Sequence, residues 1–307
     1  MSPWFFKRSS RNKAATPSAK ESLRAGTSGR RFREDVPYAL PKDLEEGQRL
    51  NFQHYIIRYV LRGNYAAPLD SSVKTILDVG SGTGIWGHEI AQAFPQARVY
   101  GLDLEPPQTI SLAAPAQAVP DNYHFIQGNV LKGLPFPDHM FDYVHQRLLF
   151  LGVPQQSWPA VIRELVRVTQ PGGWVEIYEA DILFPDAGPA TRELNSWTRQ
   201  FMGMRGIDTT QMRQLGDLLR QQGLLNVTAR TLEVPLGNWD RLGQLLEKDY
   251  LSGIRALKEP ACAALHLSPQ KYEQILLIAS KEWAQTHARY RHYLAYGQTP
   301  TAEFLQL

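Results

Sequence analysis

The chain has 307 residues, 43% of them hydrophobic and 21% charged, a composition typical of a folded globular protein. No run of about eighteen apolar residues occurs, so the sequence predicts no membrane span. A single cysteine, Cys262, excludes a disulfide within the chain and is typical of a reducing, intracellular compartment. The length favours one large domain with additions over two independent domains.

The net charge of +3 is distributed unevenly along the chain. Residues 1–33 contain nine Lys or Arg and one acid, Glu21, so this segment carries +8 and the remainder −5. Its Ser, Thr, Ala and Gly content without apolar periodicity predicts a disordered basic tail over residues 1–36. Such a tail is a transit peptide, a nuclear signal, a site for an acidic protein partner, or simply solvated. The acidic remainder argues against a nucleic-acid groove, so we expect a cytoplasmic or nuclear protein that binds no nucleic acid.

An amphipathic helix is expected over residues 44–62, before the first strand and over the ligand cleft. On this helix, Gln53 and Tyr55 are candidates to touch a ligand. His54 shares a face with apolar residues, which favours a buried core histidine over a catalytic one.

The most informative segment is 75–107, TILDVGSGTGIWGHEIAQAFPQARVYGLDLEPP. It predicts a buried strand, a tight turn, a helix and a second strand that ends at Asp103-Leu104. Glycines let the backbone turn sharply and approach a ligand closely, and Asp103 is placed to bind ribose hydroxyls. The segment therefore predicts a nucleoside-binding βαβ unit, whose turn contains Asp78, Gly80, Ser81, Gly82, Thr83 and Gly84.

Two nucleoside cofactors are compatible with these glycines. Gly82 to Gly87 satisfies the G-x-G-x-x-G dinucleotide pattern, but Asp78 would repel a pyrophosphate. The longer string Asp78-x-Gly80-x-Gly82-x-Gly84 resembles motif I of class I S-adenosylmethionine-dependent methyltransferases. This resemblance implies S-adenosyl-L-methionine as the cofactor, with its methionine half in the loop and its amino group near Asp78. Whether the Ser81 and Thr83 hydroxyls meet the cofactor carboxylate or cap the helix stays open.

Downstream blocks follow in the order of the same superfamily. They are Gly128-Asn129-Val130, LPFPD-x-x-FD with a fourth strand from Phe141, and R-V-x-x-PGG. A helix from residue 158 is expected to stop at the Pro-Gly-Gly turn before a fifth strand over 174–178. The resemblance implies adenine contacts from Asn129 and Val130. The family usually has an aspartate where this chain has Asn129, whose carbonyl oxygen is still an acceptor.

Polar residues also follow the fourth and fifth strands. His145 and Gln146 are predicted to lie near the transferable methyl group, where His145 acts as a general base or as a structural histidine. Glu179 and Asp181 meet the acceptor or remain loop acids. The other histidines show no metal-ligand spacing, so no metal is expected.

The C-terminal part predicts helices over 189–222 capped near Asp208 and Thr209, a strand over 224–234, a helical insertion over 239–289 and a last strand over 290–297. These elements complete an α/β fold with a mostly parallel, seven-stranded, Rossmann-like sheet. We expect a methyltransferase domain over 37–307, divided into a helical cap (37–72), a cofactor-binding core (73–181) and substrate-side helices with the last strands (182–307).

Residues 38–69, HQR after the fourth strand, PGGWVEIYEAD and YLAYGQTP are similar to the UMTA-like, TAM-domain methyltransferases of fungi. That group is related to a methyltransferase-like regulator of fungal secondary metabolism. The resemblance implies methyl transfer to a small-molecule acceptor by in-line displacement. Its alternative is a regulatory or binding protein with little catalysis.

Overall fold

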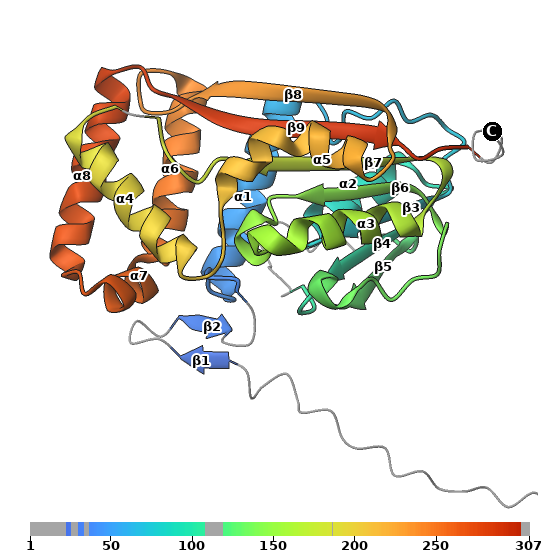
Figure 1. Ribbon diagram of the computed structural model, residues 1–307, viewed down its shortest axis with the longest axis horizontal. Helices are drawn as coiled ribbons and strands as arrows, with labels where there is room; N and C mark the ends of the chain where they lie inside the picture. Colours follow the sequence, from blue (N-terminus) through green and yellow to red (C-terminus); the bar gives the residue numbers. More distant parts are fainter. Residues whose placement is uncertain (1–22, 26–29, 34–36, 108–118, 186, 302–307) are drawn as a thin grey trace, which may run out of the picture.

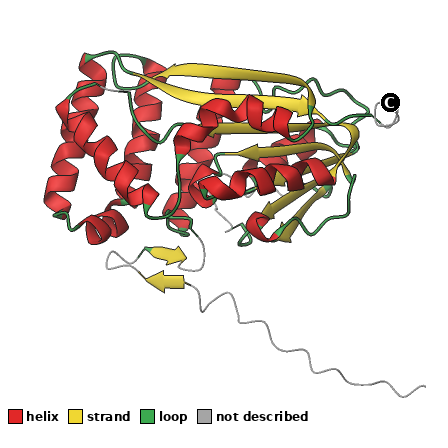
Figure 2. Cartoon of the chain, in the orientation of Figure 1, coloured by secondary structure: helices red, strands yellow, loops and turns green. Residues whose placement is uncertain are grey.

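The computed structural model describes residues 23–25, 30–33, 37–107, 119–185 and 187–301. A twisted central sheet carries helices on both faces. A separate group of helices, α4, α6, α7 and α8, stands beside one end of this sheet (Figures 1 and 2). Helix α1 lies between this group and the sheet.

The sheet has seven strands in the order β5-β4-β3-β6-β7-β9-β8. Neighbours from β5 to β7 pair in parallel, whereas β9 is antiparallel to both β7 and β8. This arrangement confirms the predicted mostly parallel α/β sheet. The strands are β3 (Thr75–Val79), β4 (Arg98–Asp103), β5 (Tyr123–Gln127), β6 (Phe141–Arg147), β7 (Thr169–Ala180), β8 (Leu225–Pro235) and β9 (Arg289–Gln298).

The helices confirm the predicted alternation and the helical insertion between the last two strands. Asp208 caps a short 3₁₀ helix by accepting a hydrogen bond from the Thr210 N–H, as its sequence context predicted. The helices are α1 (Leu44–Leu61), α2 (Ile85–Ala93), α3 (Trp158–Val168), α4 (Pro189–Gly203), α5 (Leu215–Gln221), α6 (Arg241–Ala256), α7 (Lys258–Leu265) and α8 (Pro269–Gln285). The 3₁₀ helices are η1 (Val130–Lys132), η2 (Phe150–Gly152), η3 (Gln155–Ser157) and η4 (Thr209–Gln214).

The boundary between α3 and β7 differs from the prediction. The helix ends at Val168, and β7 begins at Thr169, so the Pro-Gly-Gly sequence lies inside the strand instead of before it. Pairing with β6 is irregular between Phe141 and Tyr143, and Gly172 has a φ of +79°. The Pro-Gly-Gly residues form a bulge within β7, because β7 pairs with β6 on both sides of them.

Part of the N-terminal segment also differs from the prediction. Strands β1 (Leu23–Ala25) and β2 (Arg31–Arg33) form an antiparallel pair, so disorder throughout residues 1–36 is wrong for these strands. The rest of the predicted tail lies outside the described residues. The guanidinium of Arg30 binds the carboxylate of Asp43, the N-cap of α1, and lies 3.0 Å from Glu45. This contact ties the hairpin to the folded domain.

The hydrophobic core follows the alternation of side chains along the strands. On β3, Ile76 packs with Trp86 and Ile90 of α2, whereas Leu77 packs on the opposite face with Leu165 of α3. A third cluster joins the end of β7 to the helical group and includes Trp283 of α8. A fourth, smaller cluster packs Ile57 of α1 against Tyr178 and Leu294 of the sheet. The described residues therefore form two large cores on the sheet, one beyond it and a small one under α1.

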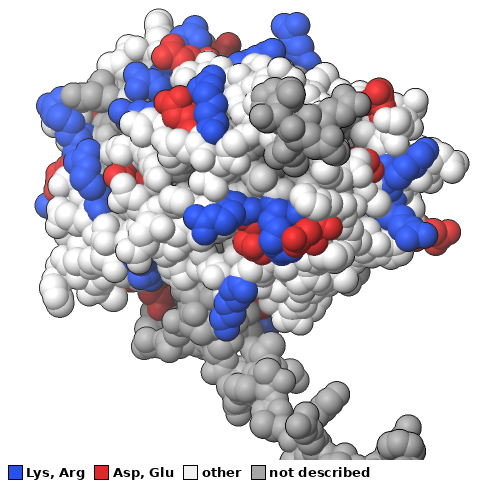
Figure 3. Space-filling model, turned by 45° about the vertical axis from the view of Figure 1, so that its right-hand side comes forward, with Lys and Arg blue, Asp and Glu red and all other residues white. Residues whose placement is uncertain are grey.

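The surface drawn in Figure 3 carries charges of both signs, with Lys or Arg and Asp or Glu side by side near its centre. This face does not present a continuous basic stripe. None of the helices among the described residues has the length and apolar character required to cross a membrane.

Candidate active site

A cavity of about 1040 Å³, including its open mouth, lies where β3, β4 and β6 end. We call it the first cavity. Ligand sites of open α/β sheets lie at this carboxyl edge, because the loops leaving neighbouring parallel strands diverge there. The predicted residues that line it are Asp78, Gly80, Ser81, Gly82, Thr83, Asp103, Leu104, Asn129, Val130 and His145.

The turn after β3 requires glycine for two separate reasons. Gly80 and Gly82 have φ values of +76° and +55°, in the left-handed region that other residues rarely adopt. A Cβ on Gly80 would also lie 2.9 Å from Leu149 Cδ1. The Gly80 and Ser81 N–H groups both donate to the Leu102 carbonyl, which fixes the turn against β4.

Asp103 stands at the tip of β4, opposite this turn. Its Oδ2 accepts a hydrogen bond of 2.9 Å from the Gly82 N–H, and its Oδ1 lies 3.5 Å from the Lys42 ammonium. Lys42 in turn lies over the ring of Tyr38, 4.7 Å from its centroid. The segment before α1 therefore closes one side of the first cavity, a contact that the sequence did not reveal.

Asp78 and His145 form the floor of the first cavity. They are neighbours in the β3–β6 register, and His145 Nδ1 lies 2.8 Å from Asp78 Oδ1. The imidazole stacks on Trp86 with ring centroids 3.8 Å apart and an angle of 5°. A carboxylate accepts hydrogen bonds, so Nδ1 of His145 carries the proton that it shares with Asp78. The ring is thus held in place from two sides.

Two of the predicted cofactor contacts, Gly84 and Gln146, do not line the first cavity. Gln146 points to the other face of β6, where its side-chain nitrogen donates to Glu179 at 3.1 Å. Successive residues of a strand face opposite sides, so His145 and Gln146 do not both line one cavity. Gly84 does not line it either: it is the N-cap of α2, with φ +78°, and its role is conformational.

The Thr83 hydroxyl and Asn129 have local partners. The Thr83 hydroxyl donates to Asn51 Oδ1 of α1 at 2.6 Å, so it joins the turn to the helix above it. Asn129 Oδ1 accepts from the Leu131 N–H at 3.0 Å and caps η1. An amide oxygen has two lone pairs, so one of them is left for a ligand.

Three other polar residues have structural roles. His54 is fully buried, and its Nδ1 accepts a hydrogen bond of 3.1 Å from Arg147, which confirms the core interpretation. Burial, helped by the charge of Arg147, lowers the pKa of His54 to about 4. Glu179 is buried and accepts from the Leu149 N–H, whereas Asp181 pairs with Arg213. Neither acid lines the first cavity.

Arg147 is a functional candidate that the sequence did not single out. It is the last residue of β6, it lines the first cavity, and burial lowers the pKa of its guanidinium. A buried cation at this position suits an anionic group of a ligand. Two sequence signals pointed to it: its place in the HQR block after the fourth strand, and its position two residues after His145 on the same strand face.

A second cavity of about 690 Å³, including its open mouth, adjoins the first, and four residues line both: Tyr38, Leu50, Gln53 and Leu148. We call it the second cavity. Its walls come from α1, α6, and the segments after β6 and β7. The aromatic lining residues are Tyr38, Phe150, Phe184, Tyr250 and Tyr290.

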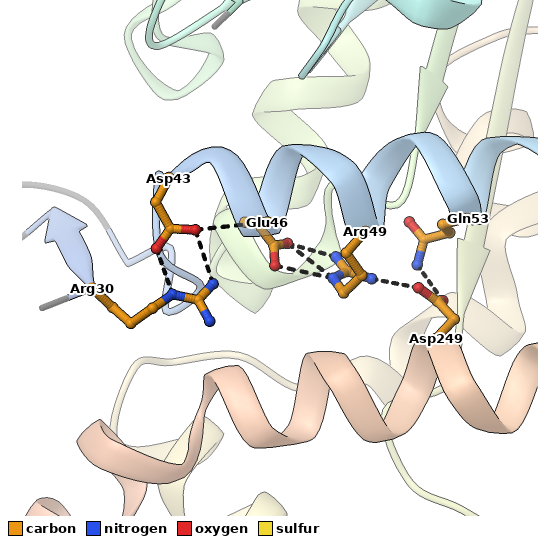
Figure 4. A network of polar contacts seen from close by, with 6 residues as sticks. All are labelled: Arg30, Asp43, Glu46, Arg49, Gln53 and Asp249. Carbon is orange, nitrogen blue, oxygen red and sulfur yellow. Dashed lines mark hydrogen bonds and ion pairs between the residues drawn. The ribbon is translucent and has the colours of Figure 1, made fainter. Parts of the chain in front are cut away.

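One corner of the second cavity is polar. Asp249 of α6 is buried, and its oxygens accept hydrogen bonds of 2.8 Å from Arg49 and from Gln53 on α1. Arg49 also binds Glu46, so a chain of polar contacts runs from Arg30 along α1 to Asp249 (Figure 4). This chain holds α1 against α6 at the junction of the two cavities.

Comparisons with known proteins agree with this geometry. Residues 76–173 match a family described as a methyltransferase domain. The chain is 32% identical over 207 residues to methyltransferase str3 of Strobilurus tenacellus. This alignment covers 66% of the present chain and 71% of str3. It is 28% identical over 216 residues to the secondary metabolism regulator LAE1 of Cochliobolus heterostrophus, covering 66% of this chain and 67% of LAE1.

A solved structure also shares the fold. A chain from the complex of the Haloferax volcanii Trm112 methyltransferase activator with a methyltransferase superposes with a TM-score of 0.50 at 16% identity. This alignment covers 84% of the present chain and 94% of the other.

The strand order and the glycine turn between two carboxylates define an α/β protein that binds a nucleoside cofactor at its carboxyl edge. The chain belongs to the class I S-adenosylmethionine-dependent methyltransferases, and S-adenosyl-L-methionine is its cofactor. The dinucleotide alternative is thereby excluded.

The first cavity fits this cofactor. Its glycine turn would be obstructed by a Cβ at Gly80, and Asp103 presents its carboxylate to the same space. Asp78 and Arg147 contribute an anion and a cation, the two charges that a zwitterionic amino-acid group requires.

Proposed function

We propose that this protein transfers the methyl group of S-adenosylmethionine to a small-molecule acceptor of secondary metabolism, with the cofactor in the first cavity and the acceptor in the second. The observation that carries the proposal is the direct junction of the two cavities at Tyr38, Leu50, Gln53 and Leu148. A polar cofactor site that opens into an apolar cavity suits transfer to an organic molecule rather than to a nucleic acid.

Each residue of the first cavity has a proposed role. Asp103 binds the ribose hydroxyls, and Asn129 with Val130 and Leu104 surrounds the adenine. Asp78, oriented by His145, holds the ammonium of the methionine half, while Arg147 and the turn at Gly80 to Thr83 hold its carboxylate. The residues of the chain thus fix both ends of the cofactor.

The cofactor, when bound, supplies a methyl group that is already activated by the positive sulfur. The protein needs to align the acceptor in line with the bond that breaks and to exclude water. The junction residues are placed for this task, because they border both cavities. Because His145 orients Asp78, we expect His145→Ala to weaken cofactor binding and to lower turnover as well.

The proposed division of the chain follows from the two cavities. Residues 37–72 form the cap that closes both, residues 73–181 form the cofactor-binding core, and residues 182–307 supply most of the acceptor side and the last strands. A regulatory protein with little catalysis is the second candidate, because the chain is similar to the regulator LAE1 over two thirds of its length.

Two measurements test the proposed function. Thermal shift with S-adenosylhomocysteine and with NAD should show stabilisation by the first ligand only, because a ligand that binds the native state raises its melting temperature. Single-turnover assays with methyl-labelled cofactor against fungal secondary metabolites should yield a labelled product. Cofactor binding without transfer to any of them would favour the regulator.

A further inference from the structure

Gln53 of α1 is a polar side chain at the junction of the two cavities. Its side-chain nitrogen Nε2 donates to Asp249 Oδ2 at 2.8 Å. A carboxylate only accepts hydrogen bonds, so the amide must turn its nitrogen toward Asp249. The amide oxygen Oε1 therefore lies on the side away from Asp249, as Figure 4 shows.

The orientation of this amide is imposed by buried neighbours. Asp249 is 1% exposed, and Arg49 Nη1 donates to its other oxygen, Oδ1, at 2.8 Å. Arg49 is itself held by Glu46 at 2.6 Å. Because both oxygens of Asp249 are engaged, the carboxylate cannot rotate without breaking two hydrogen bonds, and Gln53 keeps a single orientation.

We infer that the amide oxygen of Gln53 accepts a hydrogen bond from the N–H of a neutral amine, the methyl acceptor, and that Asp249 is a positioning residue acting through Gln53. This inference rests on the proposed function, since it requires the acceptor to occupy the second cavity. The aromatic walls at Phe184, Tyr250 and Tyr290 indicate that the amine is carried on an apolar body that contains a ring.

An amine suits this junction better than an alcohol. A neutral amine attacks with its lone pair while its N–H stays bonded to the amide oxygen, whereas an alcohol must lose its proton at neutral pH. An amide oxygen is too weak a base to remove that proton. The acceptor nitrogen forms the new N–C bond as the S–C bond breaks, and the electron pair of that bond stays on sulfur. The proton remains on the methylated ammonium and passes to water after release.

Matched probes test the inference. Indoline and tetrahydroquinoline are weakly basic ring amines that are neutral at pH 7.5, and their N-methyl derivatives carry a methyl group in place of the N–H donor. Calorimetry on the full chain saturated with S-adenosylhomocysteine should show roughly three- to tenfold tighter binding of the N–H probes, the value of one neutral hydrogen bond. Gln53→Met, which keeps the length of the side chain but removes the acceptor, should abolish this preference.

The Asp249→Asn substitution tests directly whether Asp249 sets the orientation of the Gln53 amide. Arg49 keeps the oxygen of the introduced amide facing its guanidinium, so the nitrogen of that amide faces Gln53. Gln53 must then turn its oxygen toward the introduced nitrogen and present its own nitrogen to the junction. The preference for the N–H probes should therefore be lost, because the nitrogen lone pair of either member of a pair can accept from the Gln53 amide. Asp217→Asn, which removes the same charge from an exposed acid of α5, is the matched control and should leave the preference unchanged.

The outcomes separate the two proposals. Failure of S-adenosylhomocysteine to bind the unmodified protein would defeat the proposed function. Cofactor binding with no binding of the N–H probes at millimolar concentration, or with equal affinity for both members of each pair, would overturn the amine inference alone. A preference that persists unchanged in Gln53→Met and Asp249→Asn would overturn it as well.

Discussion

The two cavities lie side by side but are assembled from the chain in different ways. Most of the first cavity comes from residues 78–104 and 128–149, at the ends of consecutive strands. The second cavity draws on Leu40, Gln53, Phe184, Tyr250 and Tyr290, which are spread over most of the chain. The residues of the first cavity therefore belong to local sequence motifs, whereas the second cavity exists only after distant segments have packed together.

This difference predicts different sensitivities. The first cavity depends on backbone conformation and on a few charges, which strand ends and turns hold in place. The second depends on the packing of α1, α6 and α8 around aromatic rings. Substitutions in the first should change cofactor affinity, and substitutions in the second should change stability and acceptor choice.

The largest effect is expected for Phe184→Ala. Phe184 is 4% exposed, lines the second cavity and stacks on Trp283 with ring centroids 4.4 Å apart. Loss of this ring should lower the free energy of unfolding by about 3–5 kcal/mol, measured by urea titration. Affinity for S-adenosylhomocysteine at 15 °C should stay within a few-fold. A large loss of cofactor affinity in a folded variant would contradict the separation of the two cavities.

Asp103→Ala should have the next largest effect, in the first cavity. It removes the proposed ribose acceptor and the partner of the Gly82 N–H. Hydrogen bonds to a charged group contribute about 1.5–3 kcal/mol each, so calorimetry should show at least a roughly 100-fold loss of S-adenosylhomocysteine affinity. Gly82→Val, which places a β-branched residue at φ +55°, should have a comparable effect. Unchanged affinity in both variants would remove Asp103 and this turn from the cofactor site.

The buried carboxyl group of Glu179 on β7 should make the stability of the protein depend on pH. Burial raises the pKa of Glu179 from its usual 4.5 to about 8. Between these values the native state binds more protons than the unfolded state, so the free energy of unfolding should fall as the pH rises from about 5 to 8. Glu179→Gln stays neutral and should be more stable than the unmodified protein at pH 8, by on the order of 1–2 kcal/mol.

Denaturant titrations at pH 5.5 and 8 measure this difference, with Asp217→Asn as a control for loss of an exposed acid. Because Gln retains only one acceptor oxygen, its stability at pH 5.5 should be equal to or below that of the unmodified protein. An identical pH dependence in Glu179→Gln and the unmodified protein would show that Glu179 does not cause it.

The smallest effect is expected for Asn129→Asp. Aspartate retains the cap on the Leu131 N–H and offers a stronger acceptor to the adenine amino group. Affinity for S-adenosylhomocysteine should rise a few-fold, while affinity for S-inosylhomocysteine, which lacks that amino group, should not. Equal changes for both ligands would place Asn129 away from the adenine amino group.

The sequence alone determined the succession of strands and helices along the chain, the helical insertion and most of the residues of the first cavity. Asp78, the glycine turn and Asp103 form a local pattern, because a turn that approaches a ligand needs glycine at particular positions and strand tips need polar residues there. Gln146 is turned away from the cavity that His145 lines, because successive residues of a strand face opposite sides of the sheet.

Tertiary structure decided the remainder. Lys42, which lies over the ring of Tyr38, reaches Asp103 across 61 positions, and Gln53 meets Asp249 across 196 positions. No periodicity or motif links such residues, because their proximity follows from how α1 and α6 pack over the sheet edge rather than from neighbouring backbone. The first cavity is thus readable from the chain, whereas the second cavity and the orientation of Gln53 arise only from the packed fold.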